Sequence, residues 1–295
     1  MPAIRHEKYW FEDGDMLLHH RYPDPKIHDT LYKIHSSKLS SRNLHTTKPP
    51  FDWEDQATVD LSNCHYALLD EASNVDREDL LELLDHVYGS NSHAQSDYRR
   101  IASLLRISSP SQLDIPQLHD EARARFESLV PNEPENLATF RCDWAEDAMA
   151  LSIQYQITEV QKPLLYYLIA HSHLDTFPPW VQPNTVDDIT ERVETIMPRL
   201  IDQFTPIIFT PPPTSHMECT DIVADRWMSL VIAPALEGGG TGKPLEVLDA
   251  MKALNWEKEG VCGDCTRDKR DEWTEEQRTI WRLLDGWISE VQNRT

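Results

Sequence analysis

Two short apolar runs on either side of a proline-rich turn constrain the fold of this chain more than any other feature of its sequence. Residues 16–18 (Met-Leu-Leu) form the first run, and the second contains Leu31, Tyr32 and Ile34. Between them, residues 22–25 read Tyr-Pro-Asp-Pro. Proline fixes its own φ and an aspartate side chain bonds to nearby backbone, so both favour a reversal of the chain. The pattern predicts a β-hairpin.

The residues after this hairpin continue a mixed pattern up to about residue 130. A serine-rich segment, residues 36–43, has one large apolar residue and is predicted to form a short helix with a serine cap. Residues 64–69 (Cys-His-Tyr-Ala-Leu-Leu) are predicted to form a strand. Apolar residues at helical spacing predict three helices, over residues 76–88, 98–106 and 117–129.

The first of these three helices has the clearest boundaries. Gly89 follows its last residue, where a left-handed backbone conformation is needed. Its apolar residues lie on one face, so its acidic residues are expected on the solvated faces. These acidic residues are Asp79, Glu82 and Asp85.

From about Pro131 onward, strand signals almost vanish and helical periodicity takes over. Six helices are predicted, over residues 145–155, 163–171, 186–200, 221–231, 244–254 and 271–291. Residues 204–213 contain three consecutive prolines, which favour an extended linker over packed structure. The chain is therefore expected to be α+β, with a small mixed head followed by an all-α C-terminal body.

Charge and composition exclude several classes of function. The 295 residues include 50 Asp and Glu against 28 Lys and Arg, a net charge of −22, and so negative a surface repels nucleic-acid phosphates and anionic lipid. No apolar run approaches the ~18 residues of a bilayer span, and the N-terminus has no apolar signal core. The five cysteines, an odd number, do not indicate a disulfide framework. We expect a cytoplasmic or nuclear protein that binds neither nucleic acid nor membrane.

Three motifs in the first part of the chain resemble the BTB/POZ domain of the fungal type. Residues 11–18 (FEDGDMLL) are similar to its opening Asp-Gly-Asp and apolar strand, and residues 32–42 (YKIHSSKLSSR) to its aromatic-x-x-His-x-x-x-Leu signature. Residues 79–89 (DLLELLDHVYG) are similar to its next helix, which ends in Tyr-Gly. The resemblance implies a BTB/POZ-like domain over residues 8–130, a short sheet clasped by helices, and a helical C-terminal region over residues 131–295.

The C-terminal region also resembles the body found in that fungal group, which has no established activity. This second resemblance rests on four segments, residues 221–227, 255–256, 262–265 and 281–287.

The resemblance implies a non-catalytic protein–protein interaction module, in which the head associates with other proteins or with a second copy. An alternative is a substrate adaptor of a cullin-type ubiquitin ligase. The segment that carries the family's hydrophobic-x-Glu motif reads Asp52-Trp53-Glu54 here, with an aspartate in the apolar position. The family's charged pocket pairs an aspartate, matched by Asp15, with a basic residue, and Ser36 stands in that second position.

The candidate partner-binding surface combines the aromatic segment before the first strand with the serine-rich segment. Aromatic residues are enriched among those that dominate interfaces, and the alternative is that they pack on the chain's own helical body. At roughly 25 cal/mol per Å² of apolar surface, the serine-rich face contributes little to an obligate dimer. The candidate residues are Tyr9, Trp10, Phe11, Ser37, Ser40 and Ser41.

Cys262-Gly263-Asp264-Cys265 is the sharpest local motif of the chain, and it has three interpretations. Two thiolates at this spacing can share one tetrahedral zinc ion, for which His216 and Cys219 are candidate further ligands. A thiol-redox pair would follow a strand in a βαβ unit, and none is predicted here. The third interpretation, a buried structural turn, is favoured. We therefore assign no metal ligand and expect no cofactor, and we keep a zinc-binding protein as an alternative function.

Three further motifs are weaker signals of catalysis. Residues 171–175 (His-Ser-His-Leu-Asp) resemble the His-x-His-x-Asp-His ligands of metallo-β-lactamase-like hydrolases, but Thr176 replaces the last histidine, and histidines suit a helix C-terminus. Residues 238–244 lack the Ser or Thr of a phosphate-binding loop and are expected to form a mobile surface loop. His35 has no nucleophile near it in sequence. We assign no catalytic residue and expect no enzymatic activity.

Overall fold

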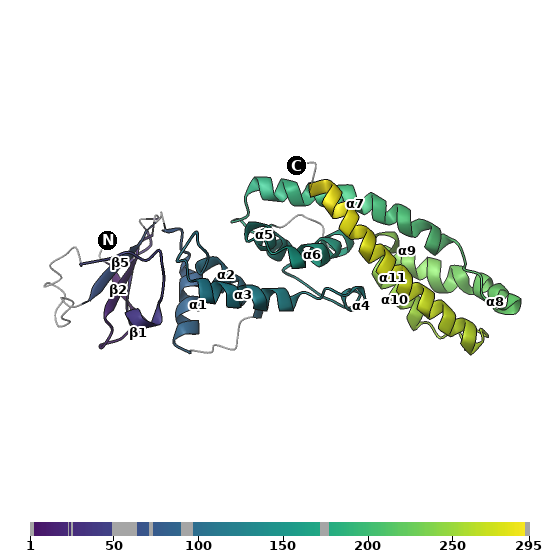
Figure 1. Cartoon of the computed structure of the whole chain (residues 1–295), viewed down its shortest axis with the longest axis horizontal. Coiled ribbons are helices and arrows are strands. Elements are labelled where there is room, and N and C mark those ends of the chain that lie inside the picture. Colours follow the sequence, from purple (N-terminus) through teal and green to yellow (C-terminus); the bar gives the residue numbers. More distant parts are fainter. Residues whose placement is uncertain are drawn as a thin grey trace. The chain divides into compact units, whose positions relative to one another are not determined.

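The computed structural model describes residues 3–292 except for residues 23, 25, 49–63, 71–72, 90–96 and 172–176. The chain divides into two compact units, an N-terminal unit, Met1–Leu129, and a C-terminal unit, Val130–Thr295 (Figure 1). The N-terminal unit combines a small sheet with helices, and the C-terminal unit is helical in its described part. The expectation of a mixed head and an all-α body is confirmed at this level. No described helix has both the length and the apolar character needed to span a membrane.

A five-stranded sheet forms the first part of the N-terminal unit, in the order β1-β3-β2-β5-β4. Strands β2 and β3 pair antiparallel, with Met16 opposite Ile34, so the predicted hairpin is confirmed. Strand β5, the third predicted strand, lies parallel to β2, and β1 lies parallel to β3. Every residue of β2 and β3 is buried. The strands are β1 (Ile4–Trp10), β2 (Met16–His20), β3 (Thr30–Ile34), β4 (Thr46–Thr47) and β5 (His65–Leu69).

The described residues of the N-terminal unit also form three α-helices, all of which were predicted: α1 (Arg77–Val87), α2 (Asp97–Ile107) and α3 (Pro116–Leu129). Asp76 caps α1, because its side chain accepts a hydrogen bond from the backbone N–H of Glu78. Gly89, just beyond α1, has a φ of 68°, the left-handed conformation that favours glycine there.

The solvated position expected for the acidic residues of α1 is wrong for two of them. Asp79 is 3% exposed and Glu82 is 8% exposed. Arg106 of α2 donates two hydrogen bonds to the Asp79 carboxylate, from Nε at 2.8 Å and from Nη2 at 2.7 Å. A buried carboxylate requires a charged or hydrogen-bonded partner, and the second helix supplies it.

The helix predicted over residues 36–43 is also wrong, because only Ser36–Lys38 forms a single 3-10 turn, η1. Farther along, the backbone N–H groups of Arg42 and Asn43 bond to another segment instead of to their own preceding residues. The N–H of Arg42 donates to the carbonyl of Asp114 at 3.1 Å, and the N–H of Asn43 donates to the carbonyl of Leu113. These long-range partners take the donors that a helix would use.

The described part of the C-terminal unit is built from helices, and it encloses large buried side chains such as Phe204, Trp227 and Trp256. The helices are α4 (Pro134–Leu137), α5 (Ala145–Gln154), α6 (Thr158–His171), α7 (Pro183–Phe209), α8 (Met217–Trp227), α9 (Ala233–Glu237), α10 (Pro244–Ala253) and α11 (Gly263–Gln292). A π-turn, η4 (Met228–Ile232), joins α8 to α9, and a 3-10 turn, η5 (Gly240–Gly242), precedes α10.

The linker expected over residues 204–213 is largely part of α7, which runs on to Phe209. Phe204 and Ile208 are both fully buried, and burial of these side chains outweighs the cost of Pro206 inside the helix. Only residues 210–216 remain to join α7 to α8.

The glycine-rich segment, expected to be a mobile surface loop, is exposed at Gly238 and Gly239 but forms a regular 3-10 turn at Gly240–Gly242. Gly240 is buried, and a Cβ atom at this position would lie 2.3 Å from the carbonyl oxygen of Ala235. The backbones of α9 and η5 therefore approach each other at a distance that only glycine permits.

Candidate metal centre

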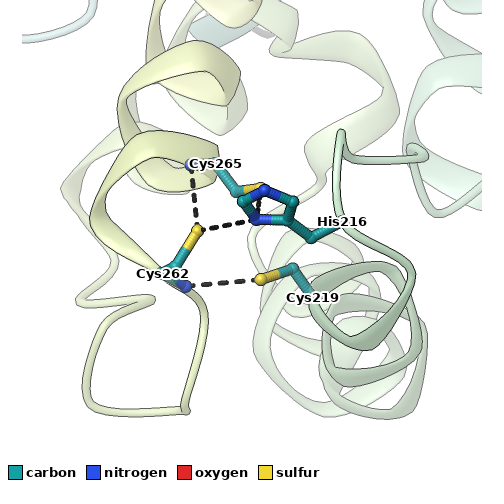
Figure 2. A group of neighbouring side chains, drawn as sticks. All are labelled: His216, Cys219, Cys262 and Cys265. Carbon is teal, nitrogen blue, oxygen red and sulfur yellow. Dashed lines mark hydrogen bonds between the residues drawn. The ribbon is translucent and has the colours of Figure 1, made fainter.

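Four potential metal ligands converge in the C-terminal unit: His216, Cys219, Cys262 and Cys265. Their ligand atoms all lie within 4.8 Å of one another. The side chains of the first two point toward those of the CxxC motif (Figure 2). His216 Nδ1 lies 3.2 Å from Cys262 Sγ and 3.5 Å from Cys265 Sγ. The two candidate ligands named from the sequence, His216 and Cys219, therefore lie beside the two cysteines of the motif and bring the number of possible metal ligands to four.

The starts of two helices hold these ligands in place. His216 is the N-cap residue of α8 and Cys219 lies in its first turn, whereas Cys262 and Cys265 flank the start of α11. Around His216, the N–H of Thr220 donates to its carbonyl at 3.0 Å, and the hydroxyl of Thr214 donates to the same oxygen at 2.8 Å. This backbone bonding leaves the imidazole free to face the thiols.

The faces that carry the cysteines continue along α8 and α11 toward an aromatic cluster. Cys219 and Trp227 are eight residues apart on α8, and so are Cys265 and Trp273 on α11, a spacing that keeps each pair near one helix face. The ring centroids of Trp227 and Trp273 are 6.5 Å apart, and Trp256 lies 6.2 Å from Trp227. Packing of these tryptophans sets the register in which the cysteine-bearing helix ends meet.

The surroundings of the three thiols act in opposite directions, raising the pKa of Cys219 and lowering that of Cys265. The backbone N–H of Cys262 donates to Cys219 Sγ at 3.4 Å, and that of Cys265 donates to Cys262 Sγ at 3.5 Å. Hydrogen bonds from Ser215, and from Thr214 and Cys262, outweigh burial and lower the pKa of the Cys265 thiol to about 6. Cys265 and Cys219 are buried, Cys262 is half-buried and His216 is exposed. All five cysteines of the chain are free thiols.

The donor set fits a zinc ion. A tetrahedral ion with Zn–S bonds of about 2.3 Å places its ligand atoms about 3.8 Å apart, close to the observed spacing. Three sulfurs and one imidazole nitrogen favour zinc over magnesium or calcium, which take oxygen ligands. Four protein ligands fill a tetrahedral site and leave no open position for substrate, which is the arrangement of a structural site.

The aromatic residues proposed for partner binding pack within their own unit to different degrees. Tyr9 is 1% exposed and its hydroxyl bonds to Asp85, so it is not part of an exposed surface. Phe11 is half-buried and stacks on Tyr88 with ring centroids 4.6 Å apart. Trp10 is half-buried, and the Arg5 guanidinium lies 4.7 Å from its ring centroid. These contacts lie inside the N-terminal unit.

The three candidate serines are more accessible. Ser37 and Ser40 are exposed, and Ser41 is half-buried with its hydroxyl bonded to the carbonyl of Leu113. Next to them, Ser36 donates to Asp15 through its N–H at 2.6 Å and its hydroxyl at 2.5 Å. These bonds lower the pKa of Asp15, so the aspartate matched to the family's charged pocket is held by the serine itself.

His35 has the satisfied position expected for a structural histidine. Its backbone N–H donates to the Tyr88 hydroxyl at 2.9 Å, and its Nδ1 lies 3.0 Å from the same oxygen. Its Nε2 lies 3.3 Å from Asp13. Both ring nitrogens are therefore partnered.

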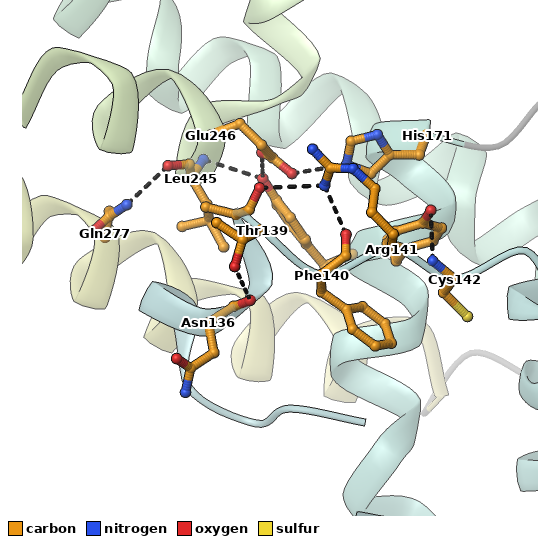
Figure 3. Close-up of polar contacts among 12 residues, drawn as sticks. Asn136, Thr139, Phe140, Arg141, Cys142, His171, Leu245, Glu246 and Gln277 are labelled. Atoms are coloured by element: carbon orange, nitrogen blue, oxygen red, sulfur yellow. Dashed lines mark hydrogen bonds and ion pairs between the residues drawn. The ribbon is translucent and has the colours of Figure 1, made fainter. Parts of the chain in front are cut away.

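His171 ends α6 and contacts a carboxylate that the sequence motif did not include. Its Nε2 lies 2.9 Å from Glu246 Oε1, and the two side chains point toward each other (Figure 3). The buried hydroxyl of Tyr166 also bonds to Glu246 and accepts a hydrogen bond from the N–H of Leu245 at 3.1 Å. The rest of the motif, residues 172–176, lies outside the described residues. Glu246 thus serves to join α10 to α6.

Comparison with protein-family models, curated proteins and solved structures finds no match for this chain. The likeness to BTB/POZ domains thus stays a prediction from sequence motifs. The segment expected to contact a cullin, Asp52-Trp53-Glu54, lies outside the described residues. The metal centre depends instead on geometry within the C-terminal unit.

Proposed function

We propose that this chain is a non-catalytic zinc-binding protein that holds one structural zinc ion through His216, Cys219, Cys262 and Cys265. The observation that carries the proposal is that four ligand atoms of the right chemistry lie within 4.8 Å of one another. Cys219 and Cys262 are 43 residues apart in sequence, so only the folded unit brings them together. The ion would fasten the start of α8 to the start of α11.

The effect of such an ion on stability is large. Structural zinc sites in small domains contribute ~10–16 kcal/mol of apparent binding free energy at pH 7. The C-terminal unit has its own apolar core, so we expect metal removal to loosen the two helix starts and the connection at residues 210–216 without unfolding the whole unit. The three clustered tryptophans report this change, because two of them lie on the cysteine-bearing helices.

Metal content tests the proposal directly. The full chain, expressed with zinc supplied and purified without chelator, is expected to contain one zinc per chain by elemental analysis. Cys262→Ala should lose the zinc because it removes one of the four ligands. Cys262 is chosen because it is the least buried of the three ligand thiols. Cys142→Ala is the matched control, because Cys142 is a buried thiol of the same unit outside the cluster, and it should keep its zinc.

Cobalt substitution separates loss of the site from loss of the fold. Co²⁺ bound to three thiolates and an imidazole absorbs visible light through tetrahedral d–d bands and sulfur-to-metal charge transfer. We expect these bands in the wild-type and Cys142→Ala proteins. A wild-type protein that keeps well under one equivalent of zinc and shows no such bands would contradict the proposal.

A second function, protein–protein interaction through the N-terminal unit, is supported by the hairpin β2–β3 followed by the His35 turn, the arrangement in which the sequence resembles BTB/POZ domains. This support is an analogy of fold, and a fold hosts many functions. The accessible part of the proposed surface is Trp10 with Ser37 and Ser40.

Affinity capture with the full chain tests this second function. A variant combining Ser37→Arg and Ser40→Arg should lose partners that the wild-type protein captures, whereas Ser128→Arg, at an exposed serine of α3, should keep them. Light scattering at several concentrations tells self-association from a foreign partner. Identical captured proteins for both variants would reject this surface. Cullin among the partners, lost on replacement of Trp53 and Glu54, would favour the adaptor alternative.

A further inference from the structure

A pocket of about 370 Å³ lies between the π-turn η4, helix α9 and helix α10 of the C-terminal unit. These elements are neighbours in the green part of the ribbon (Figure 1). The volume falls within the range of ~300–1,000 Å³ that is typical of small-molecule sites. Side chains such as Leu230, Val231, Val247 and Met251 make the walls largely apolar. None of the four metal ligands lines it.

The π-turn that forms one wall has a covalent cause. Pro234 has no N–H, so the carbonyl of Leu230 cannot receive the usual helical hydrogen bond from four residues ahead. The N–H of Ala233 bonds to the carbonyl of Met228, five residues back. Such widened turns occur frequently at functional sites. Gly240 and Ala235, whose backbones approach each other closely, also line the pocket.

The two charged side chains that line the pocket, Glu246 and Lys243, differ in whether their charge is already paired. Glu246 lines it, but its carboxylate is occupied by His171 at 2.9 Å and by the Tyr166 hydroxyl. Lys243 is the one cationic side chain that lines the pocket, and it makes no ion pair within the described residues. The site therefore offers apolar walls with a single free positive charge.

We propose that this pocket binds a small apolar anion, an aromatic or aliphatic carboxylate or sulfonate. Its hydrocarbon part lies against Val247 and Met251 and its acidic group pairs with Lys243. Apolar burial supplies most of the affinity, and the charge pair orients the ligand. The site is independent of the metal centre, so the two proposals succeed or fail separately.

The probe for this site is 8-anilinonaphthalene-1-sulfonate, an aromatic sulfonate whose fluorescence rises in apolar surroundings. We expect one saturable site on the full chain, whether or not it carries zinc, with displacement by decanoate. Ala250→Phe places a larger side chain at an exposed residue that lines the pocket, and it should abolish this site while zinc content and near-UV circular dichroism stay unchanged.

The charge is tested with a matched pair of lysines. Lys243→Gln should weaken the sulfonate by about threefold to fivefold, the effect of losing one partly exposed ion pair, whereas Lys258→Gln, at an exposed lysine outside the pocket, should not. N-phenyl-1-naphthylamine, the probe without its sulfonate, should bind more weakly and ignore Lys243→Gln. Sulfonate binding that survives Ala250→Phe, or that is equal in the two lysine variants, would overturn the proposal.

Discussion

At the scale of single residues, the contact between Asp79 and Arg106 shows how a charged residue on a helix can be buried when a neighbouring helix supplies its partner. Asp79 lies on α1, and its carboxylate receives two hydrogen bonds from the Arg106 guanidinium of α2. The Asp79 side chain is 4% exposed and that of Arg106 is 23% exposed. A paired, planar contact of this kind fixes both the spacing and the rotation of two helices.

Replacement of Asp79 by alanine is expected to destabilise the N-terminal unit by about 3 kcal/mol, since it removes the carboxylate that accepts two hydrogen bonds from the mostly buried Arg106 guanidinium. The measurement is unfolding of the full chain in urea, monitored with a spectroscopic probe placed in the N-terminal unit. Glu121→Ala is the matched control, because its ion pair with Arg125 on α3 is half exposed, and such pairs contribute under ~1 kcal/mol. Equal effects of the two substitutions on the free energy of unfolding would show that the buried Asp79 contact contributes no more than an exposed ion pair.

At the scale of elements, the turn between α9 and α10 requires two backbone segments to approach each other closely. Gly240 lies against the backbone of Ala235, with the nearest oxygen 2.3 Å from the place of a Cβ atom. Gly242, two residues later, has nothing within 4 Å of that place. Backbone, unlike a flexible side chain, cannot move aside without shifting the helix itself.

Gly240→Ala is expected to destabilise the C-terminal unit by about 1–3 kcal/mol through this overlap. Gly242→Ala should be neutral, or stabilising by ~0.4–1 kcal/mol, because it restricts only the unfolded chain. Thermal unfolding of the zinc-loaded proteins measures both. If Gly240→Ala matched Gly242→Ala, the two backbones would have to lie farther apart than the structure places them.

At the scale of the whole molecule, the described histidines with a lowered pKa gather in one of the two units. Within the part of the chain that the structure describes, burial lowers the pKa of five histidines, and all five belong to the N-terminal unit: His6, His19, His20, His86 and His119. Each binds a proton more readily in the unfolded chain than in the folded one. The stability they support is complete above their unfolded pKa, about 6.5, and it falls as the pH drops below that value. Burial raises the pKa of Glu82, which acts in the opposite sense.

Lowering the pH from 7.5 to 5.5 should therefore reduce the stability of the N-terminal unit. Hydrogen exchange measured by mass spectrometry reports the protection of β2 and β5 separately from the rest of the chain. The exchange rates are corrected for the intrinsic effect of pH. His20→Gln should reduce the loss, because His20 is buried with Nε2 3.0 Å from the carbonyl of Val75. His45→Gln, at an exposed histidine, is the control. Protection of β2 that does not change with pH would contradict this account.

The sequence by itself determined the elements whose signals are local. The β2–β3 pairing follows from two apolar runs around a Pro-Asp turn, and α1 follows from apolar periodicity between Asp76 and Gly89. Two of the predictions that were wrong, the helix at 36–43 and the linker at 204–213, concern segments whose backbone or side chains find distant partners. Local propensity cannot report such partners.

Only the tertiary structure decided which residues make the candidate sites. The CxxC motif was visible in sequence, but its two further ligands are contributed by the start of α8, and their convergence depends on packing of Trp227 against Trp273. The apolar pocket likewise arises from Pro234 opening a helical turn opposite α10. The physical reason is the same in both cases: hydrogen-bonded turns and periodic faces depend on near neighbours, whereas ligand sets and cavities depend on how finished helices pack.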